Sequence, residues 1–252
     1  MSSVVVMPAC NRPEMLALSL QGLSRTNNCP QDVQIYADHH ANLDDIARVR
    51  DLYFPEAFLF RARPHILAIS GSWNILNSIK SAARFAEDVY LVEEDVVVFP
   101  NFFHWHQTQT APVSCGRRHW DPRWKHRDLY TNPGSLLRRP LLDALVPHIN
   151  DSYIAAPREY LDRTFGPWHE VSHLDDGLIR NVMREKGWAA AYPESAVCAH
   201  IGFKNYGVLD RFKNDEKDLS KRVERLQQML STLSSSDPFA RDFESIVPSH
   251  LF

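Results

Sequence analysis

Strand-like segments alternate with helix-like segments along residues 1–100, and this alternation limits the fold more than any other feature of the sequence. The strand-like segments are short and mostly apolar, as expected for strands buried on both faces: residues 4–7, 33–37, 58–63 and 89–92. The segments between them place apolar residues at helical spacing: residues 13–23, 42–52 and 73–85. Such a chain forms an α/β fold with helices on both faces of a mostly parallel sheet. We expect Pro8 to close the first strand.

The second half of the chain is less regular. Residues 114–133 are rich in Arg, His, Trp and Asp and predict loops. Residues 136–145, 176–186 and 212–233 have the patterns of helices, and the last of these is strongly charged. The sequence therefore predicts an α/β domain over residues 1–210, followed by a C-terminal helix and tail over residues 211–252.

Composition and charge exclude several classes of protein. The formal net charge is -3 and the pI is near 6.4, so the chain has no overall basic field for nucleic acid or for an anionic membrane. Neither G-x-G-x-x-G nor a P-loop sequence occurs, and none of the four cysteines forms a C-x-x-C pair. No apolar run approaches the roughly 20 residues of a membrane span, and the first residues do not resemble a signal peptide. We expect a soluble, cytoplasmic protein.

Three consecutive acids follow the last strand-like segment: Glu93, Glu94 and Asp95. Carboxyl ends of parallel strands meet at the ligand-binding edge of an α/β sheet, so Arg12 and Asp38, which follow the first two strands, should lie near them. Adjacent carboxylates repel one another at the end of a buried strand, and a divalent cation relieves this repulsion. The sequence therefore favours a metal site here, and the alternative is a solvated strand end.

The segment around these acids, residues 89–103, resembles the metal-binding segment of GT-A glycosyltransferases, in particular the N-acetylglucosaminyltransferase I family. That family has Glu-Asp-Asp followed by Pro-x-Phe-Phe, and Glu94 stands here in place of its middle Asp. The resemblance implies a GT-A-like, Rossmann-like domain, with a nucleotide-binding half over residues 1–100 and an acceptor half over residues 101–210. It also implies that Asp95 holds Mn²⁺ (or Mg²⁺) bridging a UDP-sugar diphosphate, with Glu93 and Glu94 near the donor.

Other segments follow in the order of that family. The resemblance implies that Arg12 lies near a phosphate or the base and that Asp38 reads the uracil. Trp73 lies on a helix like the one before the metal strand, where the side chain is either a sugar platform or part of the core. His200 follows a Pro-Glu stretch, and it is either a further metal or phosphate ligand or a core residue.

Asp175 and Asp176 lie in a segment that resembles the one supplying the catalytic base of the family. Inverting sugar transfer needs one carboxylate to take the proton of the acceptor hydroxyl and a cation to stabilise the leaving diphosphate. Adjacent residues on a helix point about 100° apart, so only one can be the base. Registration with the family favours Asp176, and Asp175 would hold the acceptor or cap the helix. The alternative is that both acids serve only the helix dipole.

Two other motifs lead to rival hypotheses. His169, Glu170 and His173 fit the H-E-x-x-H pattern of zinc peptidases. The cations and tryptophans of residues 117–127 (Arg117 to Arg127) are typical either of an acceptor site, for a glycan or an anionic acceptor, or of a solvated loop, with nucleic-acid binding as a third and less favoured alternative. A non-catalytic carbohydrate-binding protein is the third hypothesis. His104 and His106 are predicted to form a surface pair without a role.

Overall fold

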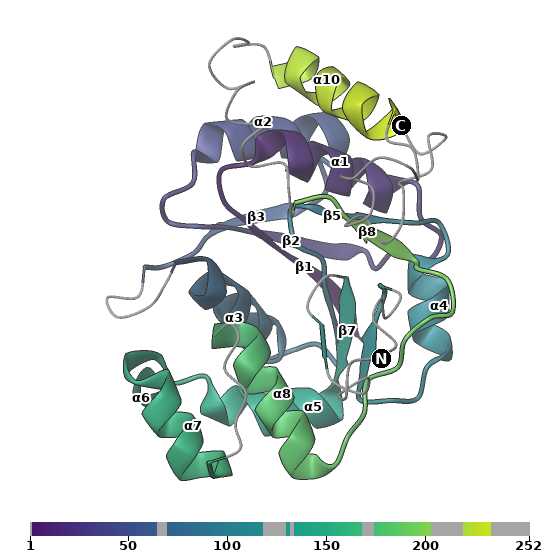
Figure 1. Cartoon of the computed structure of the whole chain (residues 1–252). Coiled ribbons are helices and arrows are strands. Elements are labelled where there is room, and N and C mark those ends of the chain that lie inside the picture. The colour runs from purple at the N-terminus through teal and green to yellow at the C-terminus, as the bar shows by residue number, and fades with distance from the viewer. Residues whose placement is uncertain are drawn as a thin grey trace.

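The structure is a computed structural model that describes residues 2–64, 70–117, 130–131, 134–167, 174–202 and 219–232. Its centre is a six-stranded sheet with the order β3-β2-β1-β4-β7-β6 (Figure 1). The strands are β1 (Ser3–Ala9), β2 (Asp32–Ala37), β3 (Phe58–Arg61), β4 (Asp88–Leu91), β6 (Val113–Cys115) and β7 (Ser135–Arg138). β7 pairs antiparallel with β4 and β6, and the other pairs are parallel. The predicted, mostly parallel sheet is confirmed.

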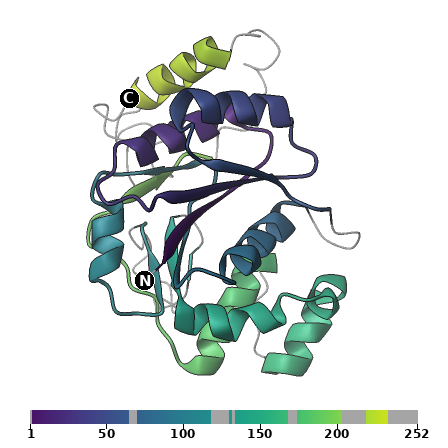
Figure 2. The same ribbon diagram turned by 180° about the vertical axis from the view of Figure 1, so that it is seen from behind.

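Helices lie on both faces of this sheet, as Figures 1 and 2 show from opposite sides. One side has α1 (Pro13–Ser24), α2 (Leu43–Tyr53) and α10 (Leu219–Thr232), and the other has α3 (Ser70–Ala82), α5 (Arg139–Leu145), α6 (Asp151–Ala155), α7 (Pro157–Phe165) and α8 (Leu174–Lys186). Along β1, Val5 and Met7 join the core on the α1 side, whereas Val4 and Val6 join the core on the α3 side. Burial on both faces explains why this strand is apolar at every position.

The strand that follows β4 along the chain belongs to a second sheet, which has two strands. β5 (Val96–Val98) pairs antiparallel with β8 (Cys198–His200), with Val96 opposite His200. Helix α4 (Phe102–Thr108) follows β5, and α1 packs against β5. The buried hydroxyl of Ser19 on α1 donates to the carbonyl oxygens of Glu93 and Val96. These contacts fix the turn between β4 and β5, where the acidic cluster lies.

Three sequence-based predictions were wrong. β1 continues through Pro8 to Ala9. Pro8 O accepts from Glu94 N on the β4 side, and the N–H that proline lacks would face the same side. Its absence therefore removes no hydrogen bond between β1 and β2. Residues 136–138 belong to strand β7 of the six-stranded sheet, and the helix begins only at Arg139, with Pro140 in its first turn. Residues 114 and 115, at the start of the predicted loop region, belong to β6. A short apolar run fits strand and helix equally well, so only pairing in the sheet decides.

The C-terminal helix α10 covers the outer side of α1 (Figure 1). Leu219, Val223 and Leu226 are buried against the core, and Arg222 Nη1 lies 2.9 Å from Glu14 Oε1 of α1. The helix was predicted over residues 212–233, of which 212–218 and 233 lie outside the described residues. Among the helices that the structure describes, none has both the length and the apolar character needed to cross a membrane.

Candidate functional site

The structure brings the predicted site residues together at the carboxyl ends of β1, β2 and β4. Arg12 is the residue before α1, Asp38 directly follows β2, and Glu93, Glu94 and Asp95 link β4 to β5. Glu94, Asp95 and Asp38 are all buried, with exposed fractions of 3% or less. Buried carboxylates need cations or hydrogen-bond donors, so the neighbours of each one define what the site can do.

Arg12 bridges the two buried acids of the cluster. Its Nε donates to Glu94 Oε1 and its Nη1 donates to Asp95 Oδ2, both at 2.6 Å. The second oxygen of Glu94 accepts from the backbone N–H of Cys10 at 2.7 Å. Burial raises the pKa of Glu94, and the contacts with Arg12 and Cys10 oppose that rise. The planar guanidinium thus joins the end of β1 to the end of β4 through two charge-assisted hydrogen bonds.

Asp95 has further partners from the two-stranded sheet. His200 Nε2 lies 3.2 Å from Asp95 Oδ2, and Ile201 N donates to the backbone oxygen of Asp95 at 2.8 Å. Burial by itself raises the pKa of Asp95, but His200 and Arg12 outweigh it and lower the pKa to about 2. Gly202 packs directly against Oδ2, because a Cβ there would lie 1.8 Å from this oxygen. Asp95 is therefore a firmly ionised carboxylate in a tightly packed niche.

The start of α8 supplies two more carboxylates to the same region. Burial, together with the charges of Asp95, Asp175 and Asp176, raises the pKa of Glu93 well above its usual range. Asp175 is 4% exposed and the side chain of Asp176 is 13% exposed. The structure thus places the predicted base segment within electrostatic reach of the predicted metal segment.

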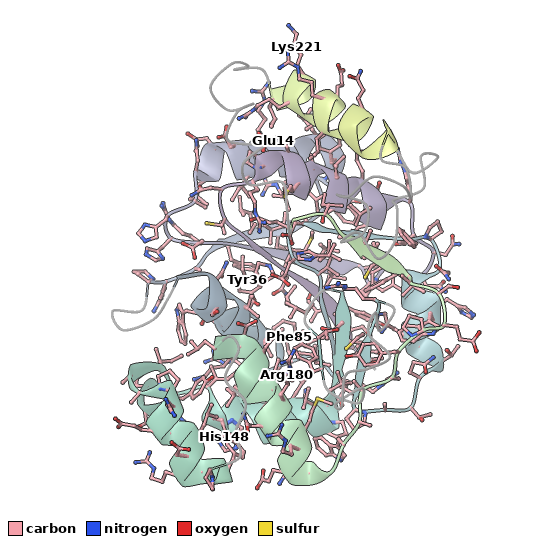
Figure 3. All side chains as sticks on the ribbon, in the orientation of Figure 1. Glu14, Tyr36, Phe85, His148, Arg180 and Lys221 are labelled. Carbon is pink, nitrogen blue, oxygen red and sulfur yellow. The ribbon has the colours of Figure 1, made fainter. Side chains whose placement is uncertain are left out.

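Arg180, one turn further along α8, has no role in the sequence-based prediction but is buried beside Asp176. Its Nη2 lies 3.8 Å from Asp176 Oδ2, and its Nε donates to the backbone oxygen of Tyr130 at 2.9 Å. Figure 3 labels Arg180 on α8 and Glu14 on α1, on opposite sides of the sheet. The i,i+4 spacing of Asp176 and Arg180 was the signal in the sequence that could have identified this pair.

Asp38 and Trp73 occupy more ordinary positions. Asp38 Oδ1 accepts from His40 N at 2.9 Å and lies 3.3 Å from His39 Nδ1, so the carboxylate organises the turn after β2. Trp73 on α3 packs against the core on the α3 side of the sheet, and its Nε1 donates to Arg63 O at 3.0 Å. Each residue has a structural partner, and a contact with a ligand stays a prediction for both.

A divalent cation fits part of this site. Asp95 Oδ1 is buried without a hydrogen-bond partner among the described residues, which suits a metal ligand, and the His200 imidazole is adjacent. No group of three His, Cys, Asp or Glu with metal-binding geometry occurs in the part of the chain that the structure describes. Mg²⁺ is commonly bound by one or two carboxylates together with substrate phosphates and water, so a metal here needs ligands from a bound diphosphate.

Several predicted residues lie outside the described part of the chain. They include His169, Glu170 and His173 of the zinc-peptidase motif and all of the basic and aromatic stretch after Arg117. His106 is described, and the prediction that it is on the surface was wrong. It is 0% exposed, and its Nδ1 is 2.7 Å from Ser114 Oγ within an aromatic cluster. The i,i+3 spacing from buried Phe103 was available in the sequence as a signal for this.

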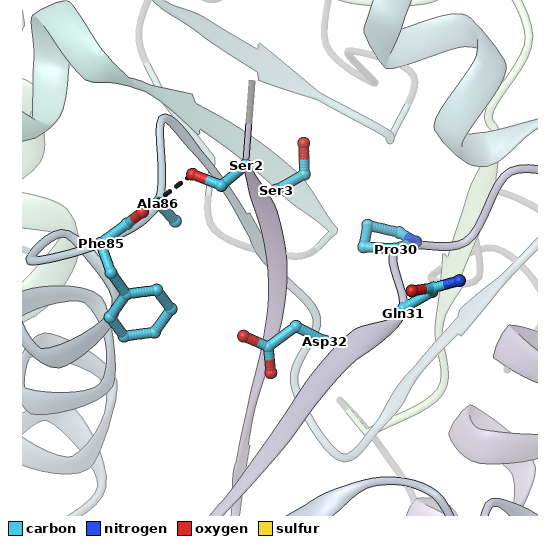
Figure 4. Close-up of a pocket in the computed structure, with 7 residues that line it drawn as sticks. All are labelled: Ser2, Ser3, Pro30, Gln31, Asp32, Phe85 and Ala86. Carbon is cyan, nitrogen blue, oxygen red and sulfur yellow. Dashed lines mark hydrogen bonds between the residues drawn. The ribbon is translucent and has the colours of Figure 1, made fainter.

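A pocket at the opposite edge of the sheet is separate from this site. It is lined by residues at the amino ends of β1 and β2 and before β4, among them Ser2, Asp32 and Phe85 (Figure 4). Ser2 Oγ donates to Phe85 O at 2.8 Å across it. Ligands of α/β sheets bind at the carboxyl ends of strands, so this pocket has the wrong location for that role.

No family model and no curated protein matches the sequence. Solved structures match the fold. A mannosyltransferase from Pyrobaculum calidifontis, in complex with GDP-Man and Mn²⁺, has a TM-score of 0.52 at 13% identity over 99% of this chain and 69% of that chain. The galactosyltransferase LgtC, in complex with donor and acceptor sugar analogs, has a TM-score of 0.53 at 11% identity over 95% and 99%.

A third match extends beyond sugar transfer. A 4-diphosphocytidyl-2C-methyl-D-erythritol synthase has a TM-score of 0.50 at 9% identity over 85% of this chain and 100% of that chain. Identities this low establish the fold and leave function to the site residues. The chain therefore has the GT-A, Rossmann-like fold of these glycosyltransferases, as the sequence predicted.

Proposed function

We propose that this protein is a metal-dependent glycosyltransferase that moves a sugar from a nucleotide-sugar donor to an acceptor hydroxyl. One observation carries the proposal: the buried carboxylate of Asp95 lies at the carboxyl edge of the sheet beside Arg12 and His200, with Oδ1 unpartnered among the described residues and the acidic start of α8 within electrostatic reach. The GT-A fold adds support, because two of the matched structures are glycosyltransferases and one of them contains GDP-Man and Mn²⁺. Sugar transfer needs a cation at the leaving diphosphate and a base at the acceptor, and this edge can supply both.

In this proposal, Asp95 and His200 would hold the metal, and the chemistry that it would supply is positive charge for the leaving diphosphate. Arg12 is 15% exposed at its side chain, so its guanidinium can reach a phosphate oxygen at the same edge. Asp38 would read the base and Glu93 would face the sugar. Glu94 has both oxygens engaged by Arg12 and Cys10, so its contribution is to hold Arg12.

Asp176 is our choice for the general base in an inverting transfer. It would accept the proton of the acceptor hydroxyl while that oxygen attacks the anomeric carbon and the diphosphate leaves. Arg180 Nη2 lies 3.8 Å from Asp176 Oδ2 and places a positive charge beside the proposed base. Asp175 is more deeply buried and would bind the acceptor or support the helix start.

The donor and acceptor are proposed from chemistry and resemblance. The donor would be a UDP-sugar carrying GlcNAc or another hexose. The acceptor would be a glycan or another hydroxyl compound near residues 117–127, whose cations suit an anionic group. Comparison of the anomeric configuration of donor and product by NMR would test inversion against retention.

Calorimetric titration of UDP in the presence of Mn²⁺ and then of EDTA tests this function. We expect UDP binding that requires metal in the wild type and is lost in Asp95→Asn. Asp32→Asn is the matched control, because it removes a carboxylate at the opposite edge of the sheet and should bind as the wild type does. Sugar binding that needs neither metal nor UDP would instead indicate a carbohydrate-binding protein. Tight zinc with peptidase activity would favour the H-E-x-x-H hypothesis.

A further inference from the structure

The guanidinium of Arg12 is bound to Oδ2 of Asp95, the carboxylate that would hold a metal ion, and leaves Oδ1 without a hydrogen-bond partner among the described residues. Nη1 lies 2.6 Å from Asp95 Oδ2, and the same oxygen lies 3.2 Å from His200 Nε2. Gly202 packs directly against this oxygen from a third direction. A divalent cation that binds either oxygen of Asp95 would therefore lie within a few ångströms of the positive charge of Arg12. Binding of the metal while Arg12 stays on Asp95 is unfavourable, because like charges at such a distance repel strongly in a buried site.

Glu94 gives Arg12 a second, independent anchor. Its Oε2 is held by the backbone N–H of Cys10 at 2.7 Å, and its Oε1 accepts from Arg12 Nε at 2.6 Å. The Nε contact involves a different carboxylate from the Nη1 contact. The guanidinium can therefore leave Asp95 while it stays attached to Glu94. Glu94 thus provides a pivot about which Nη1 can turn, because the Arg12 side chain is 15% exposed whereas the Glu94 side chain is 3% exposed.

We propose that Arg12 is an internal counter-cation that occupies Asp95 until the donor arrives and then moves to the donor diphosphate as metal binds Asp95. This inference rests on the proposed function. Its consequence is coupling between metal and nucleotide. Metal alone must displace Arg12 without giving it a new partner, whereas metal with a diphosphate offers Arg12 two phosphate oxygens in place of one carboxylate. Metal and nucleotide should therefore bind far better together than apart.

Calorimetric Mn²⁺ titration with and without UDP tests the coupling, with Arg12→Met compared with the wild type. Removal of the competing charge should tighten Mn²⁺ binding in the absence of UDP by about tenfold or more. The factor by which UDP improves Mn²⁺ affinity should fall by a similar amount. Arg50→Met is the matched control, because Arg50 on α2 pairs with the exposed Asp51 and its loss makes the same change in net charge. This control should reproduce both wild-type values.

The outcomes separate the two proposals. Equal Mn²⁺ affinity in Arg12→Met and the wild type, with UDP coupling intact in both, would overturn the role of Arg12 and leave the transferase proposal standing. Absence of joint Mn²⁺ and UDP binding in every variant would overturn the proposed function itself. If Arg12→Met does not fold, NMR of the wild type replaces it. The guanidinium signals of Arg12, assigned through Arg12→Lys, should shift when Mg²⁺ and UDP are added together, and unchanged signals would refute the inference.

Discussion

Replacing Gly202 with alanine tests how tightly the niche around Asp95 is packed. An added Cβ would lie 1.8 Å from Asp95 Oδ2, 2.7 Å from its Cγ and 3.0 Å from Arg12 Nη1. Oδ2 would have to retreat by about 1.2 Å to reach even 3.0 Å, the shortest separation that close-packed interiors tolerate for such a pair. This oxygen accepts from Arg12 at 2.6 Å, so a retreat of that size breaks the bond or drags the guanidinium with it.

The energetic cost follows from what is broken. Separation of one partner from a buried ion pair costs about 3–5 kcal/mol, whereas overpacking that the chain relaxes costs about 1–3 kcal/mol. The Asp95 side chain is 5% exposed and the Arg12 side chain is 15% exposed, so the ion pair is largely buried. We therefore expect Gly202→Ala to cost about 3 kcal/mol, the value at which the two ranges meet. That is a large share of the roughly 5–15 kcal/mol by which domains of this kind are stable.

Urea unfolding followed by tryptophan fluorescence measures this cost, and calorimetry measures Mn²⁺-dependent UDP binding in the same variant. Gly71→Ala on α3 is the control, because among the described residues no atom outside its chain neighbours and its own helix backbone lies within 4 Å of the added Cβ. In a helix this change should stabilise by no more than about 1 kcal/mol. If Gly202→Ala were as stable as Gly71→Ala and bound UDP as the wild type does, the description of the niche would be wrong.

Three further predictions concern separate parts of the molecule. Burial lowers the pKa of His106 to about 3. Below about pH 6.5 the unfolded chain therefore binds a proton at this residue that the native state does not bind. The free energy of unfolding should fall by about 2 kcal/mol between pH 7.5 and pH 5. Urea unfolding at the two pH values should show a smaller difference in His106→Gln, and an identical difference would contradict the assignment. Arg222→Met leaves Glu14 buried without its ion-pair partner and should destabilise the protein by about 3 kcal/mol, as measured by thermal unfolding. Adding Glu14→Gln to this variant should restore most of the lost stability. A double variant no more stable than Arg222→Met would argue against the pair. Asp176→Asn should reduce sugar transfer at least about a hundredfold while Mn²⁺-dependent UDP binding is kept, as radiolabelled transfer and calorimetry would show; near-normal turnover would move the role of base to Asp175.

Much of the site was visible in the sequence because it depends on local patterns. An apolar run that ends in Glu93, Glu94 and Asp95 indicates a buried strand with acids at its carboxyl end. Parallel α/β topology then requires that Arg12 lies at the same edge, and the structure confirms this placement. The GT-A-like fold was predictable for the same reason, since alternating strands and helices leave few arrangements.

Other features depend on which segments pack together, and the sequence did not determine them. Residues 136–138 became strand β7 because a place between β4 and β6 was open to them, although their local pattern also fits a helix. His106 is polar by type but buried by its neighbours.

The sequence by itself determined the kind of chain this is: an α/β protein with acids at the carboxyl edge of its sheet and without a net positive charge. The tertiary structure alone decided how those acids are used. It directed Arg12 to Glu94 and Asp95, paired β5 with β8 so that His200 meets Asp95, and set Gly202 where no side chain fits. The reason is physical. Strand and helix preferences act over a few neighbouring residues, whereas the partner of a buried charge comes from whichever distant segment the packed chain brings within about 3 Å.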